Sequence, residues 1–484
     1  MSPLPVKEAL IVFMRYPEAG QVKSRLAASV GFSEAAGIYE KLLRRTLGVV
    51  TDFITGRPHV QAYLFFTPPG RRVETEGKFP GPWQFQPQEG KHLGERMGRA
   101  DLWARDRGFT RVVLVGTDVP ALEVKDLEDA FDTLNCVDAV FGPASDGGFY
   151  LIGLRRSFPP LFSPSEWGVA EVLGRSETML VAAGRTAFRL RTLGDVDRAE
   201  DLSLLGMERL FQDRLTVVIP TVSSPATLKE LLCRLQVQTW PGDEIIMVCA
   251  EDGMDGTGPG PSLQRGEGSF PRNGGETCGE TAGEENTLPG EVDLRSGVTP
   301  LRCIRAPRGR GLQMNAGVAA ARGNLLFFLH DDSLPPAGFA YSIRKTCGDP
   351  QVSVGCFRLA FSPSNRALDA VAAWANFRSR FLKIPYGDQG LFCSKAVFEI
   401  LGGFRFPFLM EDLDFVKRAG RLGKVAVLPQ RITTSPRRYL EKGVLRASFQ
   451  NHALMFLHLL GVDNRKLYSA YYGAVFPVRE DCAP

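Results

Sequence analysis

The chain has 484 residues, of which 44% are hydrophobic and 23% charged, and its formal net charge is +4. This length exceeds one ordinary hydrophobic core, so we expect more than one domain. The small net charge, without a dense Lys/Arg tract, argues against nucleic acid as the main ligand and leaves small anionic substrates open. The nine cysteines are scattered. They indicate neither a zinc site nor a disulfide framework, and they are typical of a cytoplasmic protein.

No stretch reaches the roughly 18 apolar residues that a membrane-spanning helix needs, so we expect no transmembrane segment. The N-terminal apolar stretch is also too short for a secretory signal and lacks a small-residue cleavage site. The longest late apolar run, Ala453 to Val462, is interrupted by His458. We expect a packed helix there, and peripheral contact with a membrane surface is the alternative.

The first predicted strand runs from Glu8 to Met14 and leads into a loop that carries positive charge. Gly20 allows a turn in this loop, and Arg15, Lys23 and Arg25 supply the charge. A loop between a strand and a helix can hold phosphate through backbone N–H groups and the helix N-terminus. The spacing is not that of a P-loop, so a solvated basic turn is the alternative.

Carboxylates follow the later strands of the first half. Asp118 comes directly after the apolar run RVVLVG, and Asp197 lies where another strand gives way to a helix. These two side chains could form a metal site, although Asp118 could instead cap the helix that follows. Asp146 precedes Gly147 and Gly148, so a substrate could approach the backbone closely beside a carboxylate.

Five motifs occur in order over about residues 8–205: FMRYPEAGQVKSRL, LGERM, VGTDVP, GPASDGGFYLIGL and DVDRAEDL. Together they resemble the transferase 1 family that is associated with radical-SAM and selenoprotein genes. This group is GT-A-like, belongs with the nucleotide-diphospho-sugar transferases, and is similar to 2-phospho-lactate guanylyltransferase. The resemblance implies a nucleotide at the first loop and a divalent metal near Asp118.

The second half begins with a new strand at Leu215 and almost no linker before it. We therefore expect two packed domains, residues 1–212 and 213–484. The strand, helix, strand order at this point repeats the start of the chain, which indicates two copies of one architecture. Residues 251–299 are rich in Gly, Glu and Pro and nearly lack large apolar side chains, so we expect a disordered insertion there.

The stretch from Arg308 to Pro335 predicts a helix and then a buried strand, LLFFL, with Gly323 between them as a helix-ending residue of positive φ. His330, Asp331 and Asp332 follow the strand. Ligands of open α/β sheets bind outside the carboxyl ends of the strands. Carboxylates there can hold Mg²⁺ or Mn²⁺, and the ion can hold a diphosphate.

Two later pairs of charged residues complete the candidate site. Glu411 and Asp412 stand at the start of a predicted helix, where the helix dipole favours acidic residues and accounts for one of them. Arg437 and Arg438 form either a diphosphate clamp or an ordinary solvated pair. We expect Asp332 and Asp412 to converge on one pocket.

The motifs VVIPT, RGRGLQMNAG, FFLHDDSLP, GDQGLF, GGFRFPFLMEDLDF and TSPRRY resemble the transferase 2 family, a branch of the family-two inverting glycosyltransferases. The resemblance covers about residues 215–475 apart from the insertion. It implies Asp332 as metal ligand with His330 nearby, and Asp412, beside Glu411, as catalytic base. The other positions that match its nucleotide and substrate motifs are Pro220, Arg310, Gln313, Asn315, Gly387, Asp388 and Gln389.

Two positions depart from that family. Cys249 stands where the family has an aspartate that contacts the uracil base, so base recognition is weakened, changed or taken over by Asp252. Asp331 stands where the family usually has a small residue. The metal and catalytic-base motifs remain, so the chemistry that the resemblance implies is less affected than recognition of the nucleotide base.

These patterns predict an α/β protein with two GT-A-like, Rossmann-like domains in tandem. The predicted function is metal-dependent transfer of a sugar from a nucleoside-diphosphate donor to a small acceptor, with inversion in the C-terminal domain. One alternative is an N-terminal nucleotidyltransferase that activates a phosphorylated small molecule. Another is that one half is a non-catalytic nucleotide-binding module.

Overall fold

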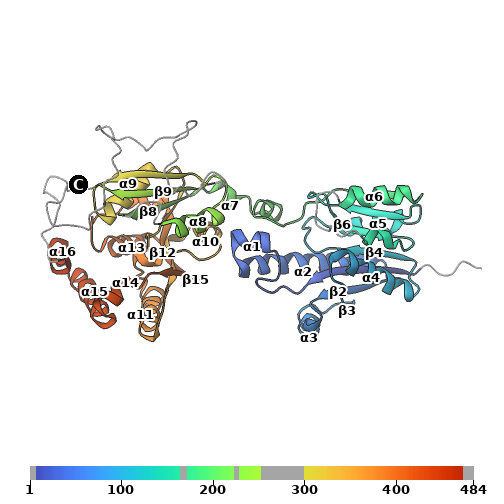
Figure 1. Cartoon of the computed structure of the whole chain (residues 1–484), viewed down its shortest axis with the longest axis horizontal. Coiled ribbons are helices and arrows are strands. Elements are labelled where there is room, and N and C mark those ends of the chain that lie inside the picture. Colours follow the sequence, from blue (N-terminus) through green and yellow to red (C-terminus); the bar gives the residue numbers. More distant parts are fainter. Residues whose placement is uncertain (1–6, 164–171, 223–227, 252–298, 473–484) are drawn as a thin grey trace, which may run out of the picture. The chain divides into compact units, whose positions relative to one another are not determined.

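The computed structural model describes residues 7–163, 172–222, 228–251 and 299–472 (Figure 1). The chain divides into two compact units, Met1–Glu208 (unit 1) and Arg209–Pro484 (unit 2). Almost all of the predicted insertion, including Asp252, lies outside the described residues. No helix within the described ranges is both long and apolar enough to span a bilayer.

The described residues of unit 1 form a seven-stranded sheet in the order β3-β2-β1-β4-β6-β5-β7. Strand β6 pairs antiparallel with both neighbours, β4 and β5, whereas the other pairs are parallel. The carboxyl ends of β1, β2 and β4 therefore meet at one edge of the sheet. The strands are β1 (Glu8–Arg15), β2 (Val60–Thr67), β3 (Gln84–Pro87), β4 (Arg111–Val115), β5 (Ala139–Pro143), β6 (Phe149–Leu154) and β7 (Ala187–Arg189).

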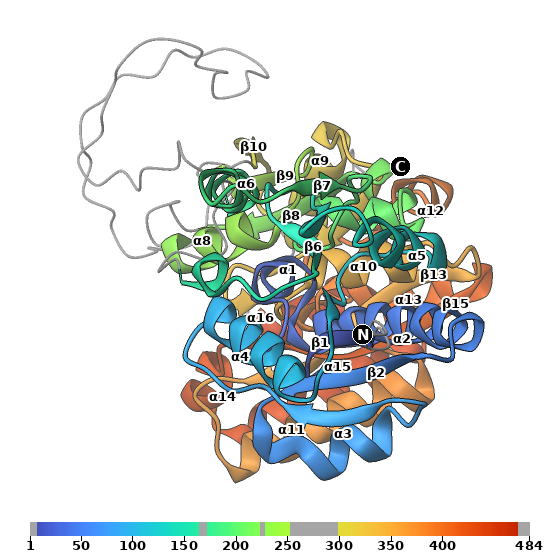
Figure 2. The same cartoon turned by 90° about the vertical axis from the view of Figure 1, so that its right-hand side faces the viewer.

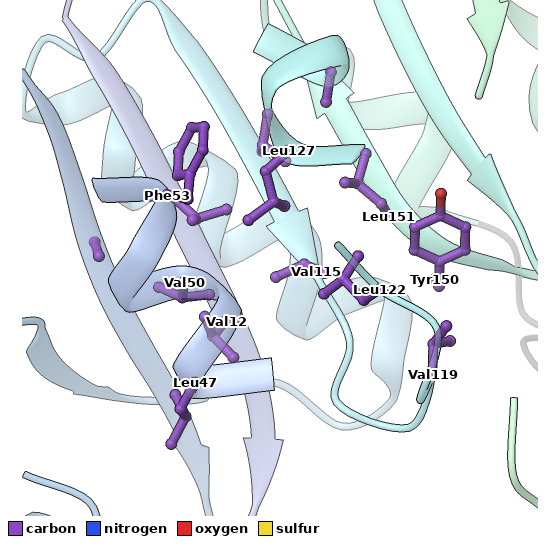
Figure 3. Packing of buried hydrophobic residues seen from close by; sticks show 14 of the residues in the cluster. Val12, Leu47, Val50, Phe53, Val115, Val119, Leu122, Leu127, Tyr150 and Leu151 are labelled. Carbon is purple, nitrogen blue, oxygen red and sulfur yellow. The ribbon is translucent and has the colours of Figure 1, made fainter. Parts of the chain in front are cut away.

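Helices cover both faces of this sheet, which explains why its central strands are apolar along most of their length. On one face, α2 (Phe32–Gly56) and α5 (Val124–Thr133) contribute Phe53 and Leu127 to a core that also holds Val12 and Val115 (Figure 3). On the other face, α4 (Leu93–Asp106) and α6 (Val172–Ala182) pack in a second cluster around Ile11. Figure 2 shows α2 and α4 on either side of β1.

The described residues of unit 2 form an eight-stranded sheet in the order β10-β9-β8-β11-β14-β13-β15-β12. Strand β14 is antiparallel to β11 and β13, so the strand in the fifth position is reversed, as in unit 1. The predicted α/β class with two copies of one sheet architecture is confirmed. The strands are β8 (Leu215–Thr221), β9 (Glu244–Ala250), β10 (Leu301–Ala306), β11 (Leu325–Phe328), β12 (Ser333–Leu334), β13 (Val352–Phe361), β14 (Leu391–Ser394) and β15 (Lys424–Thr434).

Alternate side chains of β11 enter opposite layers of unit 2. Leu326 and Phe328 pack with α9 (Arg310–Ala320) and α13 (Glu411–Leu422), whereas the Phe327 ring lies 5.4 Å from that of Phe339 on α10 (Phe339–Cys347). Five further helices of unit 2 follow β13 or β15. They are α11 (Arg366–Phe377), the short π-helix η6 (Arg378–Leu382), α14 (Arg437–Lys442), α15 (Val444–Leu459) and α16 (Asn464–Tyr472).

The helix and strand predicted between Arg308 and Pro335 are present as α9 and β11. The predicted role of Gly323 as a helix cap of positive φ is wrong, since α9 ends at Ala320 and Gly323 is not among the positive-φ glycines. A glycine is needed there because a Cβ atom would lie 2.5 Å from the carbonyl oxygen of Arg214. Glycine is therefore required at position 323 because its backbone lies close to the backbone of Arg214.

Candidate functional site

The candidate site of unit 1 is built around the ammonium group of Lys23. Its Nζ lies 3.1 Å from Asp118 Oδ2 and 2.7 Å from Asp197 Oδ1, so it bridges two carboxylates that are far apart in sequence. The Lys23 side chain is only 7% exposed. Although burial opposes its charged form, the two carboxylates raise the pKa of Lys23. A fixed cation therefore stands between the two predicted metal ligands.

The loop after β1 places Lys23 and its neighbours. Lys23 itself has left-handed backbone angles (φ 50°, ψ 50°) directly before α1 (Ser24–Val30). This conformation is uncommon for a residue with a side chain, and its cost is of the order of 1 kcal/mol. Arg25 Nη1 lies 3.6 Å from Asp197 Oδ2, and the exposed Arg15 ends β1. Gly20 forms the predicted turn, with φ 82°.

A cavity of about 390 Å³ opens beside this ion-pair cluster at the carboxyl ends of the strands. Asp118, Asp146, Asp195 and Asp197 line it, together with Gly148. Burial raises the pKa of Asp195 to about 6, and its three acidic neighbours act in the same direction. The cavity thus has an excess of carboxylates, which favours a cationic or metal-bound ligand.

A second hollow of about 270 Å³ lies on the basic side of the cluster. Its lining includes Arg15, Lys23, Arg25 and Asp197, and it shares Arg15, Tyr39 and Asp197 with the larger cavity. An anion in this hollow would meet three cationic side chains. The structure thus brings together the predicted phosphate-binding and metal-binding residues of the first half.

Asp118 and Asp146, the two carboxylates after β4 and β5, have distinct surroundings. Asp118 does not cap the following helix, because α5 begins six residues later, at Val124. There the Asp126 carboxylate accepts a hydrogen bond from the Glu123 N–H. Asp146 accepts a hydrogen bond from the Gly148 N–H at 2.8 Å, which fixes the turn through Gly147 at the cavity wall.

Tyr39 is a site residue that the sequence did not reveal. Its hydroxyl lies 2.9 Å from Thr117 Oγ1 and accepts a hydrogen bond from the Arg15 N–H. It therefore joins the ends of β1 and β4 beneath both hollows. An aromatic residue on the buried face of a long helix gives no signal of such a role, because a core position looks the same.

In unit 2 the predicted residues after β11, at the start of α9 and at the start of α13 line one cavity of about 170 Å³. Asp332 and Asp412 both belong to its wall, so the expected convergence of these two carboxylates is present. The predicted residues in this wall are Arg310, His330, Asp332, Asp388, Glu411, Asp412 and Arg438. This volume is small for a whole nucleotide sugar, so the cavity fits the reacting end of a substrate.

A contact between Gly387 and Asp412 positions the catalytic candidate. The Gly387 N–H donates to Asp412 Oδ2 at 2.6 Å, and the Leu413 N–H donates to Oδ1 at 2.7 Å. A Cβ atom on residue 387 would lie 2.9 Å from His330 Nε2. The absence of a side chain at Gly387 therefore lets the carboxylate and the imidazole approach the same backbone.

Burial shifts the pKa values of several ionisable groups in this wall, among them two carboxyl groups and an imidazole. Burial raises the pKa of Glu411 to about 8, and Asp412 adds to the effect, although Arg310 Nη1 lies 3.7 Å from Glu411 Oε1. Burial also raises the pKa of Asp388 to about 6. Burial, with Arg310 and Arg438 nearby, lowers the pKa of His330 well below its usual value. His330 is thus neutral at pH 7 and can act as a ligand.

Four predicted residues of unit 2 serve the core instead of the cavity. Gln313 donates to the carbonyl oxygens of Thr221 and Val248, and the Asn315 side chain pairs with the Phe404 backbone. Gln389 is fully buried and bonds Ser379 Oγ and the Phe357 carbonyl. Pro220 lies within β8.

The remaining charged residues near the cavity have separate surroundings. Arg437 is 75% exposed and 3.9 Å from Glu441, which matches the solvated-pair alternative, whereas Arg438 lines the cavity. Asp331 accepts a hydrogen bond from Thr221 Oγ1 at 2.7 Å, which joins the ends of β8 and β11. The extra carboxylate at this position therefore holds two strand ends together.

The residues present fit a divalent metal only in part. Among the described residues, no three His, Cys, Asp or Glu side chains gather closely enough to hold an ion by themselves. In unit 1, however, two carboxylates already hold a cation between them, and Mg²⁺ commonly binds through one or two carboxylates plus substrate phosphates. Asp118 and Asp197 in unit 1, and Asp332 with His330 in unit 2, are the residues that would hold the ion.

Comparison with known proteins gives one family match and several structural likenesses. Residues 51–169, about a quarter of the chain, match a family described as an uncharacterized protein conserved in bacteria (DUF2064). No curated protein matches the chain. A mannosyltransferase from Pyrobaculum calidifontis, in complex with GDP-Man and Mn²⁺, is 18% identical (TM-score 0.34), with 52% of this chain and 65% of that chain covered.

Two further structures are similar to the chain. A 4-diphosphocytidyl-2C-methyl-D-erythritol synthase from Anaerococcus prevotii is 12% identical (TM-score 0.30), with 43% of this chain and 96% of that chain covered. A candidate nucleotide-diphospho-sugar transferase from Desulfovibrio desulfuricans G20 is 32% identical (TM-score 0.39), with 42% of this chain and 87% of that chain covered. Because the sequences are 32% identical over 87% of the Desulfovibrio protein, the matching part of this chain belongs to the same family, which is described as nucleotide-diphospho-sugar transferases.

Proposed function

We propose that unit 2 is an inverting glycosyltransferase that moves a sugar from a nucleoside diphosphate to a small hydroxyl-bearing acceptor. The observation that carries this proposal is the single cavity that holds Asp332, Asp412 and Arg438. It combines a possible metal ligand, a possible base and a cation for the leaving group. Assignment of the halves to the transferase 1 and 2 families, and a cytoplasmic location, stay predictions.

In the proposed reaction, the acceptor oxygen forms a bond to the anomeric carbon while the bond from that carbon to the diphosphate oxygen breaks. The leaving diphosphate takes the electron pair of the broken bond. The Asp412 carboxylate takes the acceptor proton. Arg438 lies where it can face the negative charge that develops on the diphosphate. Asp332 would hold a Mg²⁺ or Mn²⁺ ion, and such an ion would neutralise part of the same charge.

Glu411 and Asp412 take different parts in this scheme. Because the pKa of Glu411 is raised to about 8, this buried side chain keeps its proton at neutral pH. The carboxylate that two backbone N–H groups orient at the cavity is that of Asp412. We therefore assign the base to Asp412 and a neutral, structural role to Glu411.

The second candidate function, nucleotidyl transfer, belongs to unit 1. The specific observation in its favour is the Lys23 bridge beside a hollow lined by Arg15 and Arg25. Phosphates that enter this hollow would attract the Lys23 ammonium and draw it away from Asp118 and Asp197. The two carboxylates are then free to hold a divalent ion next to the phosphates, as nucleotidyl transfer requires.

Replacement of Asp412 by Asn removes the proposed base and keeps the size of the side chain. We expect release of nucleoside diphosphate from nucleotide sugars, with Mn²⁺ present and water as acceptor, to fall by roughly 10²–10⁴-fold. Binding of the same nucleotide sugars, measured by calorimetry, should change little. Asp369→Asn, at an exposed carboxylate on α11, is the matched control. Unchanged turnover in Asp412→Asn would remove this residue from the mechanism.

Glu411→Gln tests the protonation state of Glu411. An unfolded glutamate titrates near 4.5, whereas folded Glu411 titrates near 8, so the folded state holds an extra proton between these values. Stability should therefore fall as pH rises through this window. Gln mimics the protonated acid, so we expect a higher unfolding midpoint than wild type at pH 8.5 and a similar one at pH 5.

The measurement for Glu411→Gln is calorimetric unfolding, with Glu441→Gln as the exposed control. The control should show no pH-dependent difference from wild type. A Glu411→Gln variant that is less stable than wild type at pH 8.5 would show that Glu411 is ionised in the folded protein.

Lys23→Met tests the bridge in unit 1. Without nucleotide, Lys23 competes with a divalent ion for Asp118 and Asp197, so its removal should tighten Mn²⁺ binding about tenfold, or about 1.4 kcal/mol. Electron paramagnetic resonance of free Mn²⁺ reports this directly. Arg25→Met is the matched control, since Arg25 is 63% exposed and farther from Asp197, and its effect should be smaller. Equal Mn²⁺ affinity in wild type and Lys23→Met contradicts the competition.

A further inference from the structure

The last part of unit 2 exposes an unusual number of large hydrophobic side chains. Ten of the fourteen that the described part of unit 2 exposes lie on α11, η6, α14 and α15 or directly after α15. On α15, Leu445 is 86% exposed and Phe449 is 78% exposed. We call these side chains the apolar face: Trp374, Phe377, Phe381, Leu382, Leu440, Leu445, Phe449, Phe456, Leu457 and Leu460.

The expected packed helix between Ala453 and Val462 is only partly present. This segment covers the end of α15 and the residues after it, where Leu454 is buried but Phe456, Leu457 and Leu460 are exposed. A helix that only packs into a core would not leave these side chains in water. Exposing several large apolar side chains to water costs free energy, so this group of side chains indicates a surface that binds a partner.

Direct contacts join α11 to α15, through His452, and to η6. The Trp374 indole N–H donates to His452 Nε2 at 2.6 Å. The Trp374 and Phe377 rings are stacked, with their centroids 5.7 Å apart. The centroids of the Phe377 and Phe381 rings are 4.8 Å apart. Figure 1 shows α11, α14 and α15 at the same end of unit 2. The aromatic side chains thus form one continuous row that reaches from η6 to α15.

The helices that carry the apolar face, together with the following α16, have an excess of positive charge. Residues 437–472 carry Arg437, Arg438, Lys442, Arg446, Arg465 and Lys466 against Glu441 and Asp463. Arg380 and Lys383, both exposed, lie at η6. The formal net charge of the whole chain is only +4, so these few helices account for much of it.

We propose that the apolar face docks on an anionic phospholipid bilayer. Aromatic and aliphatic side chains enter the region between headgroups and acyl chains, and neighbouring Lys and Arg side chains bind anionic headgroups. Pairing with a second copy of the chain is disfavoured, because a two-fold contact would place like-charged helices against each other. The inference does not depend on the proposed function.

Docking places the unit 2 cavity close to the lipid. Tyr439 on α14, with Ala447, Asn451 and Leu454 on α15, lines the cavity that also holds Asp412. The helices thus have one side at the cavity and another at the apolar face. The bilayer would lie about one helix diameter, ~10 Å, from the cavity.

The test is flotation of the full chain with vesicles of phosphatidylcholine, with and without about one third phosphatidylglycerol. The double variant Leu445→Glu/Phe449→Glu places two acids on the apolar face. Val237→Glu/Ile400→Glu is the matched control, because these residues of unit 2 are 69% and 73% exposed but lie on α8 (Lys229–Gln238) and α12 (Lys395–Ile400). Circular dichroism checks that each variant keeps the wild-type unfolding midpoint.

We expect wild type and the control variant to float with anionic vesicles, and binding to weaken at high salt. The Leu445→Glu/Phe449→Glu variant should bind at least about tenfold more weakly. Absence of wild-type binding to anionic vesicles overturns the proposal, as does equal binding of the two double variants. A dimer seen by light scattering, and lost only in Leu445→Glu/Phe449→Glu, would assign the face to a second copy.

Discussion

The hydrogen bond from the Gly387 N–H to the Asp412 carboxylate is the constraint on which the unit 2 site depends. It joins the loop before β14 to the start of α13, and the imidazole of His330, just after β11, lies against the same glycine. Three chain segments thus meet where residue 387 has no side chain. Because residue 387 has no side chain, its N–H group can approach the Asp412 carboxylate and orient it at the cavity.

The two units share a sheet order and place their acidic residues after the same strand. Asp118 follows β4 in unit 1, and Asp331 and Asp332 follow β11 in unit 2. The partner at the end of the first strand, or in the loop after it, differs, however. In unit 1 a carboxylate meets the Lys23 ammonium, whereas in unit 2 Asp331 meets the neutral Thr221 hydroxyl. One scaffold therefore offers a site where an ammonium group bridges two carboxylates and a site where the Asp332 carboxylate accepts hydrogen bonds from the Ser333 and Thr434 hydroxyls.

The sequence predicted the strand ends well, because the change from a buried apolar run to acidic residues marks where a central strand leaves the sheet. It could not separate ligand contacts from core contacts within a motif. Gln313 and Asn315 lie in the predicted nucleotide segment, but their amides bond backbone groups. The sequence motif shows that a polar residue is present at a position. The group to which that residue hydrogen-bonds depends on chain segments that are distant in sequence.

Other features depend even more on tertiary packing. Tyr39 and Leu454 both look like ordinary core positions of helices, and only the structure shows that each lines a cavity. The exposure of Phe449 likewise depends on which helices pack against α15. The roles of these residues depend on contacts between segments that are distant in sequence, and the periodicity of a helix does not show such contacts.

The central claim is that unit 2 breaks the bond between a sugar and a diphosphate. Phosphorus-31 NMR of the full chain with Mn²⁺ and a panel of UDP- and GDP-sugars tests it most directly. The account predicts that the signals of a nucleoside diphosphate appear while the nucleotide sugar disappears, and that this persists when Asp118 and Asp197 are both replaced by Asn. Pyrophosphate release from nucleoside triphosphates, with every nucleotide sugar left intact, would contradict it.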